Sequence, residues 1–286
     1  MIKSTLSVFF ALSFIGVSAQ QVILKSESTP MRGSMNTVTP EVAKPAENTL
    51  KPFEPKQFES LGQGVIELDH DVVYVGKAAP SGVNIYHLPL FGGYHKSIQQ
   101  IEDDEAFLAD CDKNFDTREK GSLFFSDMGW QYLSEGSKEM ATYRFNLAHL
   151  LNQKNIDVYW GLGVIEYQQG HYEEAIKLMT QGIETDEKFN VTLMVDLATV
   201  HIKCFTENQH PSDLQRAFKI LDDAKLLAPN FANTYMQLAL ANLVNGEIDQ
   251  AWLQFHKGYK IDPNAVDTQI LTQLLNQKPD PQGVFE

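Results

Sequence analysis

The sequence predicts an all-α chain in which helical hairpins stack side by side into a curved solenoid. Three observations support this fold class. Structural residues recur at a separation of 34 positions, glycine recurs where the first helix of a hairpin would end, and proline follows the second helix in two hairpins. A hairpin of this length cannot bury its apolar face alone, so consecutive hairpins are expected to share one core.

The composition is that of a folded acidic protein. Of its 286 residues, 43% are hydrophobic, which is enough to bury a sizeable core. The formal net charge is -14, and Lys and Arg form no cluster, whereas binding to nucleic-acid phosphates needs a basic face. Nucleic acid is therefore not expected as a partner, and the charge mainly favours solubility.

Residues 1–19 predict a secretory signal peptide. They read "MIKSTLSVFFALSFIGVSA", with one lysine, an apolar run from Leu6 to Val17, and the small residue Ala19 before Gln20. The run is too short for a membrane anchor, and no later apolar segment approaches the roughly 20 residues that a span needs. We expect cleavage near Ala19 and a periplasmic or secreted mature chain.

The region between the signal and the repeats divides into two parts. Residues 20–60 predict a disordered linker because Ser, Thr, Pro, Lys and Glu dominate their composition. Residues 61–116 predict a lead-in segment, which begins with short strands or an extended arm in "GVIELDHDVVYV" and continues through stretches rich in Pro and Gly. Helical spacing begins near Lys96.

Residues 117–265 carry the 34-residue period. Large side chains are expected to fill the space between helices, while small ones let two backbones approach. Glycine at the end of a first helix tolerates the left-handed conformation found there, and proline stops the second helix. The aligned pairs are Phe125 with Tyr159, Gly129 with Gly163, Gly136 with Gly170, Ala141 with Ala175, Ala217 with Ala251, and Pro229 with Pro263.

These residues resemble the tetratricopeptide repeat, whose 34-residue unit is a helix, a turn and a second helix. The resemblance covers Gly121 to Ala265 in four units. The core "GWQYL...YRFNLAHLLN...VYWGLGVI" is similar to exported bacterial repeat proteins of unassigned role. The resemblance implies a solenoid that binds other proteins, and it names no reaction.

The third unit and the C-terminus depart from the simple period. Ala175 and Ala217 are 42 positions apart, eight more than the repeat, and we expect most of the excess in "CFTENQHPSD" as an extended turn between the two helices. Residues 266–286 predict a capping helix and a tail, with a polar outer side that ends the stack.

The first helix of each unit is expected to line the concave inner face of the stack. The register places mostly apolar and aromatic side chains there, and buried tryptophan dominates many protein interfaces. An apolar or aromatic segment of a partner is therefore the expected guest. The candidate peptide-binding residues are Trp130, Leu133, Trp160, Val164, Tyr167, Met236 and Leu240.

Two other interpretations of this face stay open. Aromatic residues at helical spacing also belong to cores, so Trp130 and Trp160 are equally interpreted as packing residues. Alternatively, the arm in residues 61–95 folds back into the groove and reduces the open site. Members of the family that hold a terminal carboxylate of a chaperone tail use Lys, Arg and Asn on this face. The equivalent positions here include Ser126 and Val164, which disfavours that ligand.

The sequence contains no constellation that predicts catalysis, a metal or a cofactor. The stretch "ELDHD" at residues 67–71 is the nearest approach to a metal site, but adjacent strand residues point to opposite faces. No His-Glu-x-x-His, Cys-x-x-Cys, phosphate-loop or dinucleotide-binding pattern occurs. Cys111 and Cys204 lie far apart in an elongated stack, so no disulfide is expected.

The leading hypothesis is therefore a non-catalytic protein- or peptide-binding scaffold of the bacterial cell envelope. The first alternative is a structural subunit that associates with copies of itself through its repeats. The second is a metal-dependent enzyme with its site in residues 61–116. Architecture alone does not decide among the three.

Overall fold

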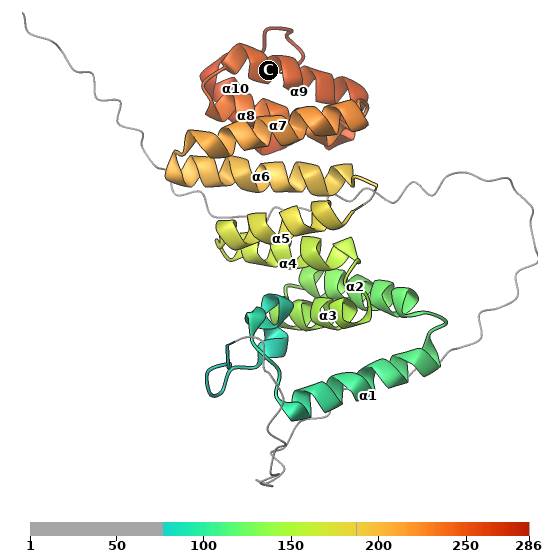
Figure 1. The fold of residues 1–286 in the computed structure, drawn as a ribbon. Helices are drawn as coiled ribbons and strands as arrows, with labels where there is room; N and C mark the ends of the chain where they lie inside the picture. The colour runs from blue at the N-terminus through green and yellow to red at the C-terminus, as the bar shows by residue number, and fades with distance from the viewer. Residues whose placement is uncertain (1–76, 187, 286) are drawn as a thin grey trace, which may run out of the picture.

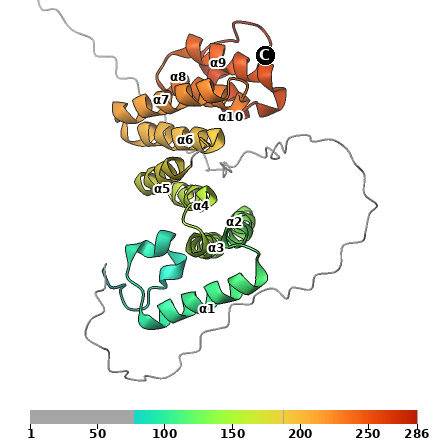
Figure 2. The same cartoon turned by 45° about the vertical axis from the view of Figure 1, so that its right-hand side comes forward.

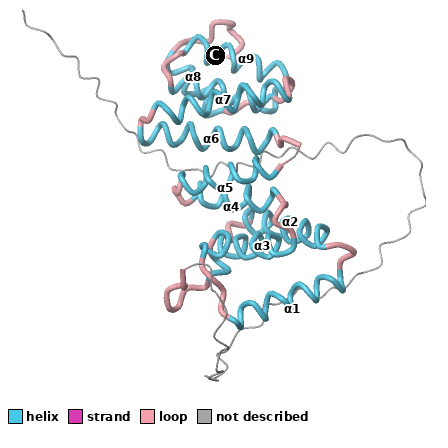
Figure 3. The backbone as a smooth tube through the Cα atoms, in the orientation of Figure 1, coloured by secondary structure: helices cyan, strands magenta, loops and turns pink. Residues whose placement is uncertain are grey.

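The computed structural model describes residues 77–186 and 188–285. These residues form ten α-helices and three short 3-10 helices, and the part of the chain described contains no strand beyond an isolated bridge between Lys77 and Tyr94. Figure 3 shows that helices dominate the tube. The all-α prediction is confirmed, whereas the signal peptide, the linker and residues 61–76 lie outside the described residues.

Eight of the helices form four consecutive antiparallel pairs, which follow one another along the stack in Figure 1 and, turned by 45°, in Figure 2. Each pair contacts the next through the second helix of one hairpin and the first helix of the following one. The predicted four hairpins are therefore confirmed. The pairs are α2 (Arg118–Ser134) with α3 (Lys138–Leu151), α4 (Ile156–Gln168) with α5 (Tyr172–Thr185), α6 (Val191–Asn208) with α7 (Pro211–Leu227), and α8 (Ala232–Val244) with α9 (Ile248–Ile261).

Glycine makes the turn inside three of these hairpins. Gly136, Gly170 and Gly246 have φ angles of 81°, 83° and 81°, in the left-handed region that other residues rarely adopt. Each glycine comes directly after the residue that caps a first helix, as the sequence predicts. The chain can therefore reverse direction within the three residues that separate the two helices of each of these hairpins.

The third hairpin corrects one expectation. The extended turn predicted in "CFTENQHPSD" is absent, because α6 continues to Asn208 and α7 begins at Pro211. Helix α6 has 18 residues against 13 in α4, and α7 has 17 against 14 in α5, which accounts for the eight extra positions. Gln209 takes the left-handed turn position with φ 57°, where the other hairpins have glycine.

The lead-in packs on the second helix of the first hairpin. Its 3-10 helices η1 (Ile85–His87) and η2 (Pro89–Gly93) contact α3, where the Asn146 side-chain amide donates to the carbonyl oxygens of Tyr86 and Leu88, each at 2.8 Å. Residues 77–95 therefore do not fill the inner face. Helix α1 (Ile98–Asn114) follows and crosses below the first hairpin in Figure 1.

One apolar core runs along the stack in three connected clusters. Ile183 and Ile220 pack against both the first and the second cluster, and Leu240 packs against the second and the third. The capping helix α10 (Thr268–Gln277) closes the third cluster by burying Ile270 and Leu274. The predicted C-terminal cap is therefore confirmed.

Candidate functional site

The candidate site is the inner face, which the first helices α2, α4, α6 and α8 form together. Helix α2 contacts α4, and α6 contacts α8, so these helices follow one another along one side of the stack. Polar side chains begin several of them: the Asn155 side chain accepts from the N–H of Asp157, and the Asn190 side chain accepts from the N–H of Leu193. These caps fix where each helix, and hence its register, starts.

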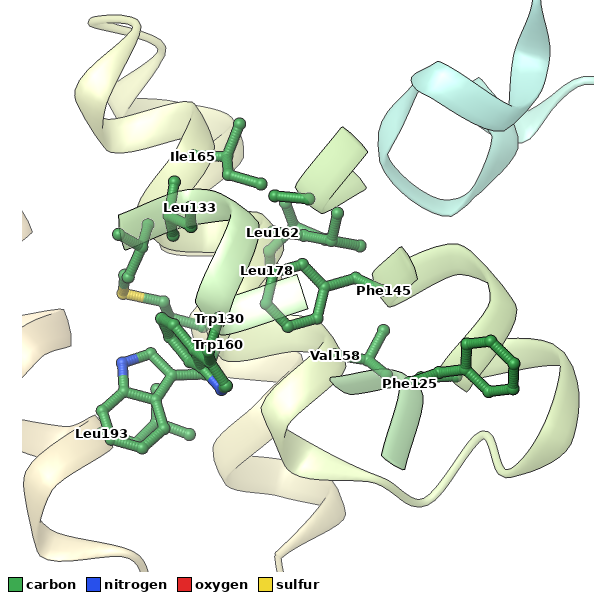
Figure 4. Close-up of a cluster of buried hydrophobic side chains, with 14 of the residues drawn as sticks. Phe125, Trp130, Leu133, Phe145, Val158, Trp160, Leu162, Ile165, Leu178 and Leu193 are labelled. Atoms are coloured by element: carbon green, nitrogen blue, oxygen red, sulfur yellow. The ribbon is translucent and has the colours of Figure 1, made fainter. Parts of the chain in front are cut away.

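Trp130 and Trp160 meet at the junction of α2 and α4, as Figure 4 shows. Their ring centroids lie 5.3 Å apart in an edge-to-face arrangement, and the ring of Phe145 lies 5.4 Å from that of Trp130. The two tryptophans are only 9% and 5% exposed. The core interpretation therefore describes their environment better than the interpretation as exposed anchors.

Each indole N–H is bound to a carboxylate of the next first helix. Trp130 Nε1 donates to Asp157 Oδ1 on α4 at 3.0 Å, and Trp160 Nε1 donates to Asp196 Oδ2 on α6 at 2.8 Å. Burial raises the pKa of Asp196 well above its ordinary value, although the Trp160 hydrogen bond opposes that shift. The two tryptophans therefore join consecutive hairpins.

The other predicted site residues divide by exposure. Leu133, Val164 and Met236 are buried at 9%, 1% and 2% exposure, whereas Tyr167 and Leu240 are half-buried. Register alone predicted an open groove, but α4 is buried on all sides over residues 158–166, because the adjacent helices cover it. Five of the seven candidates therefore lie in the core.

An accessible band remains at the carboxyl ends of α4 and α6. The rings of Tyr167 and Tyr172 have centroids 5.8 Å apart. Lys203 Nζ donates to Glu207 at 2.6 Å, which raises the pKa of Lys203, and the electrostatic influence of both tyrosines adds to that shift. An aromatic pair with an adjacent ammonium and carboxylate can hold polar and apolar groups together.

A shallow pocket of about 270 Å³ lies where the inner face meets the cap. The sequence predicted α10 only as a cap and did not identify this pocket. The feature of the sequence that could have indicated the pocket is the recurrence of glutamine and asparagine in "QILTQLLNQ". Side-chain amides that recur along one helix can line a binding site as well as face solvent. The pocket is lined by Leu243, Val244, Gln273, Asn276 and Gln277.

The described residues contain no group of three or more His, Cys, Asp and Glu side chains able to hold a metal ion. The stretch at residues 67–71 lies outside the described residues. Cys111 and Cys204 are buried and unbridged. Within residues 77–186 and 188–285, none of the helices combines the length and apolar character needed to cross a membrane.

Comparison with solved structures finds tetratricopeptide repeat proteins. A thermophilic member, TTC0263 from Thermus thermophilus, has 17% identity and a TM-score of 0.49, covering 55% of this chain and 82% of that one. The pilF protein of Pseudomonas aeruginosa has 18% identity and a TM-score of 0.48, covering 56% and 70%. YrrB, a repeat protein with an unusual peptide-binding site, has 19% identity and a TM-score of 0.43, covering 63% and 95%.

No family model matches the sequence, and no curated protein matches it. The predicted tetratricopeptide-type fold is confirmed by the chain itself, since four helical hairpins follow one another and three have their turn glycines at the expected positions.

Proposed function

We propose that the chain is a non-catalytic scaffold that binds a protein or peptide through the accessible part of its inner face. The observation that carries the proposal is the combination of Tyr167, Lys203 and Leu240 with the amide-lined pocket between α8 and α10. Trp130 and Trp160 contribute by holding the hairpins in place, and not as contact residues.

The chemistry of this face fits an extended peptide segment. A side-chain amide has both a donor and an acceptor, so Gln273, Asn276 and Gln277 match the donors and acceptors of a peptide backbone. Leu243 and Val244 supply apolar contact in the same pocket. A neutral, mixed surface of this kind favours a segment with alternating polar and apolar side chains.

Site-specific photo-crosslinking tests the proposed face. A photoreactive phenylalanine analogue is placed at Tyr167, at Gln273 or, as control, at Leu253, which is 53% exposed on α9 and belongs to the second-helix side. We expect the first two positions to give the same discrete adduct in envelope extract and the control to give none. An identical adduct pattern at all three positions would remove the inner face from the proposal.

We also propose that the scaffold works in the cell envelope, since residues 1–19 have the pattern of a secretory signal. The full chain is expressed in a Gram-negative host, and the N-terminus of the product is determined by mass spectrometry. A periplasmic product beginning at Gln20 is expected. A cytoplasmic product that retains residues 1–19 contradicts this location.

Self-association is a second candidate function, because two adjacent leucines are exposed at the end of α7. Leu226 is 79% exposed and Leu227 is 50% exposed. If copies associate through them, light scattering of the full chain gives a mass that rises with concentration, and Leu226→Gln with Leu227→Gln abolishes the rise. A monomer at all concentrations excludes this candidate.

A further inference from the structure

Arg144 is a buried cation that has no counter-ion among residues 77–186 and 188–285. It lies on α3, is 3% exposed, and has no hydrogen-bond acceptor within reach of Nε or Nη1. No described carboxylate forms an ion pair with it. Its guanidinium lies instead near three aromatic rings, with centroids 6.0 Å away for Phe125, 5.7 Å for Tyr132 and 5.5 Å for Tyr143.

This environment is incomplete for a guanidinium. The ring faces attract the positive charge, but they do not accept all of its N–H groups. A buried charge is normally paired, and an arginine fork matches a carboxylate in particular, because two parallel hydrogen bonds form at once. The chemical group that Arg144 lacks is therefore a carboxylate in an apolar setting.

Helix α1 lies against Phe125, and the 3-10 helix η1 lies against Tyr143, where the ring centroids of Tyr86 and His87 are 6.2 Å and 6.1 Å from that of Tyr143. Neither helix supplies that carboxylate. The ring of Phe107 lies 5.2 Å from that of Phe125, and Phe107 and Leu108 join the same core cluster as Tyr132 and Tyr143. The α1 carboxylate of Asp104 is already engaged, since it accepts from Tyr86 Oη at 2.7 Å and forms an ion pair with Lys96.

The fit of α1 is also poor along its length. Of its 17 residues only Cys111 is buried, while Ile98 and Ile101 remain 36% and 41% exposed. Its C-terminal end is tied by a bidentate pair between Arg118 and Asp112, with both distances 2.8 Å, in which both side chains are about half exposed. Exposed pairs of this kind contribute little to stability, so the C-terminal end of α1 can be released at modest cost.

We propose that the end of the stack formed by Phe125, Tyr132, Tyr143 and Arg144 binds an acidic amphipathic segment of another protein, which displaces α1 and pairs its carboxylate with Arg144. We name these four residues the end surface. It is separate from the inner face, and its partner is specified by charge: one carboxylate flanked by apolar side chains.

Peptide titration tests the charge requirement. The probes are a synthetic amphipathic helical peptide with leucines at helical spacing and one central glutamate, and the same peptide with glutamine there. Fluorescence anisotropy with the full chain is expected to show at least about tenfold tighter binding of the glutamate peptide, the effect of one buried charge-assisted contact. Equal affinity of the two peptides overturns the proposal.

The same titration with the Arg144→Met variant tests whether the preference for the glutamate peptide depends on an ion pair with Arg144. Methionine keeps an apolar side chain of similar length and removes an unpaired buried charge, so this variant is expected to fold at least as stably as the wild type. It should bind the two peptides equally. A glutamate preference that persists in Arg144→Met contradicts the proposal. Arg144→Lys keeps the charge without the fork, and an intermediate preference is expected.

Cys111 reports whether α1 moves. It lies on α1 at 6% exposure, and burial, with the neighbouring Asp112 and Asp110, raises its pKa to about 11. Alkylation by iodoacetamide near neutral pH is therefore slow while α1 is in place. Peptide mapping by mass spectrometry is expected to show faster alkylation of Cys111 when the glutamate peptide is added.

Cys204 is the matched internal control for this measurement. It is buried at 5% exposure in α6, far along the stack from α1, and burial raises its pKa also. Its alkylation rate should not change on addition of the peptide. If Cys111 stays protected while the glutamate peptide binds, displacement of α1 is wrong. If both cysteines react faster, the peptide unfolds the chain and the proposal fails.

Discussion

At the scale of single residues, Asp196 gives the molecule a dependence on pH. Burial raises its pKa well above the ordinary value of 3.8. Because the folded state holds this proton to higher pH than the unfolded chain does, the stability that the protonated group contributes is complete below about pH 4. That stability is lost as the pH rises through the folded pKa.

Asp196→Asn is expected to raise the unfolding temperature above that of the wild type, by a margin that grows as the pH rises above about 4. The asparagine keeps an oxygen to accept from Trp160 but cannot ionise. Calorimetric unfolding at a series of pH values measures the margin. Asp127→Asn is the control, since Asp127 lies on α2 at an exposed position. A margin independent of pH would contradict the argument.

Gln209→Gly is expected to stabilise the chain. Gln209 ends α6 with φ 57°, where Gly136 and Gly170 stand in other hairpins, and a side chain at this backbone angle is strained. Glycine removes the strain, so the free energy of unfolding should rise by about 0.5–1 kcal/mol despite its larger unfolded-state entropy. Denaturant unfolding measures the change, and exposed Gln181→Gly within α5 should show a loss instead.

The residue scale also shows what the sequence could not predict about the site. The register of Trp130 and Trp160 on the first helices was predictable, because it follows from the period. Their burial was not, because it depends on Asp157 and Asp196, which belong to the following hairpins, and on how closely those hairpins approach. A periodic pattern predicts which side of a helix a side chain occupies, but it does not predict how closely the next helix approaches that side.

At the scale of the helices, the approach of α4 to α3 depends on a glycine outside the aligned set. A Cβ at Gly161 would lie 2.1 Å from Phe145 Cζ, and at Gly163 it would lie 2.7 Å from Met179 Cγ. The period predicted Gly163 as a contact point. It did not single out Gly161, because the equivalent position in the first unit holds Asp127, which is exposed.

Gly161→Ala is expected to lower the free energy of unfolding by about 1–3 kcal/mol, as overpacking does. The fully buried ring of Phe145 also packs against Trp130, so it cannot give way freely. Gly163→Ala is the matched control with a smaller expected loss, since the methionine chain is flexible. Chemical denaturation compares the two. A larger loss at Gly163 would mean that Phe145 is more mobile than its packing indicates.

The C-terminal tail, residues 280–285, is held in place by contacts to the side chain of Asp280. The Asp280 carboxylate accepts from Val284 N at 2.8 Å and from Phe285 N at 2.9 Å, and it contacts His256 Nε2 at 2.6 Å. Burial alone would raise its pKa, but these bonds and one from Gln282 outweigh burial and lower it to about 2. The ring of Phe285 then stacks on that of His256, with centroids 5.8 Å apart.

Asp280→Asn is expected to release the tail and cost about 1–3 kcal/mol, because amide hydrogen bonds to an ionised acceptor are lost. Hydrogen exchange at the backbone amides of residues 282–285 should accelerate. The wild-type stabilisation is present above pH 3.8 and is lost as the pH falls through about 2. Asp223→Asn, which removes only a surface pair with Lys219, should change neither quantity.

The third hairpin shows a limit of sequence prediction at this scale. Most of the eight extra residues were expected in a turn within "CFTENQHPSD". They lengthen both helices instead. Helix α6 continues to Asn208 and is capped by the exposed Gln209, and α7 begins with proline in its first turn, where proline is tolerated. The amino-acid composition therefore predicted the position of the hairpin turn, but it did not predict the lengths of the two helices that the turn joins.

At the scale of the whole molecule, the solenoid was predictable because each repeat unit has large and small side chains at equivalent positions and packs on its neighbours in the same way. Large residues such as Phe125 and Tyr159 recur at one separation, and a repeat unit contacts only its neighbours. The two ends of the stack break this symmetry. There α1 and α10 meet the repeats with unique side chains, so neither the unpaired Arg144 nor the pocket beside α10 follows from the period.

The cap is therefore expected to be essential to the stability of the last hairpin. A chain ending at Ile261 loses Ile270 and Leu274, whose burial is worth about 1.5–3 kcal/mol each, and exposes Trp252 and Phe255, which are fully buried in the complete chain. Its unfolding temperature should fall, and its binding of a hydrophobic dye should rise. Full-length Gln273→Ala with Asn276→Ala, which changes only exposed residues of α10, should unfold like the wild type. An unchanged unfolding temperature in the shortened chain would mean that α8 and α9 hold their core without the cap.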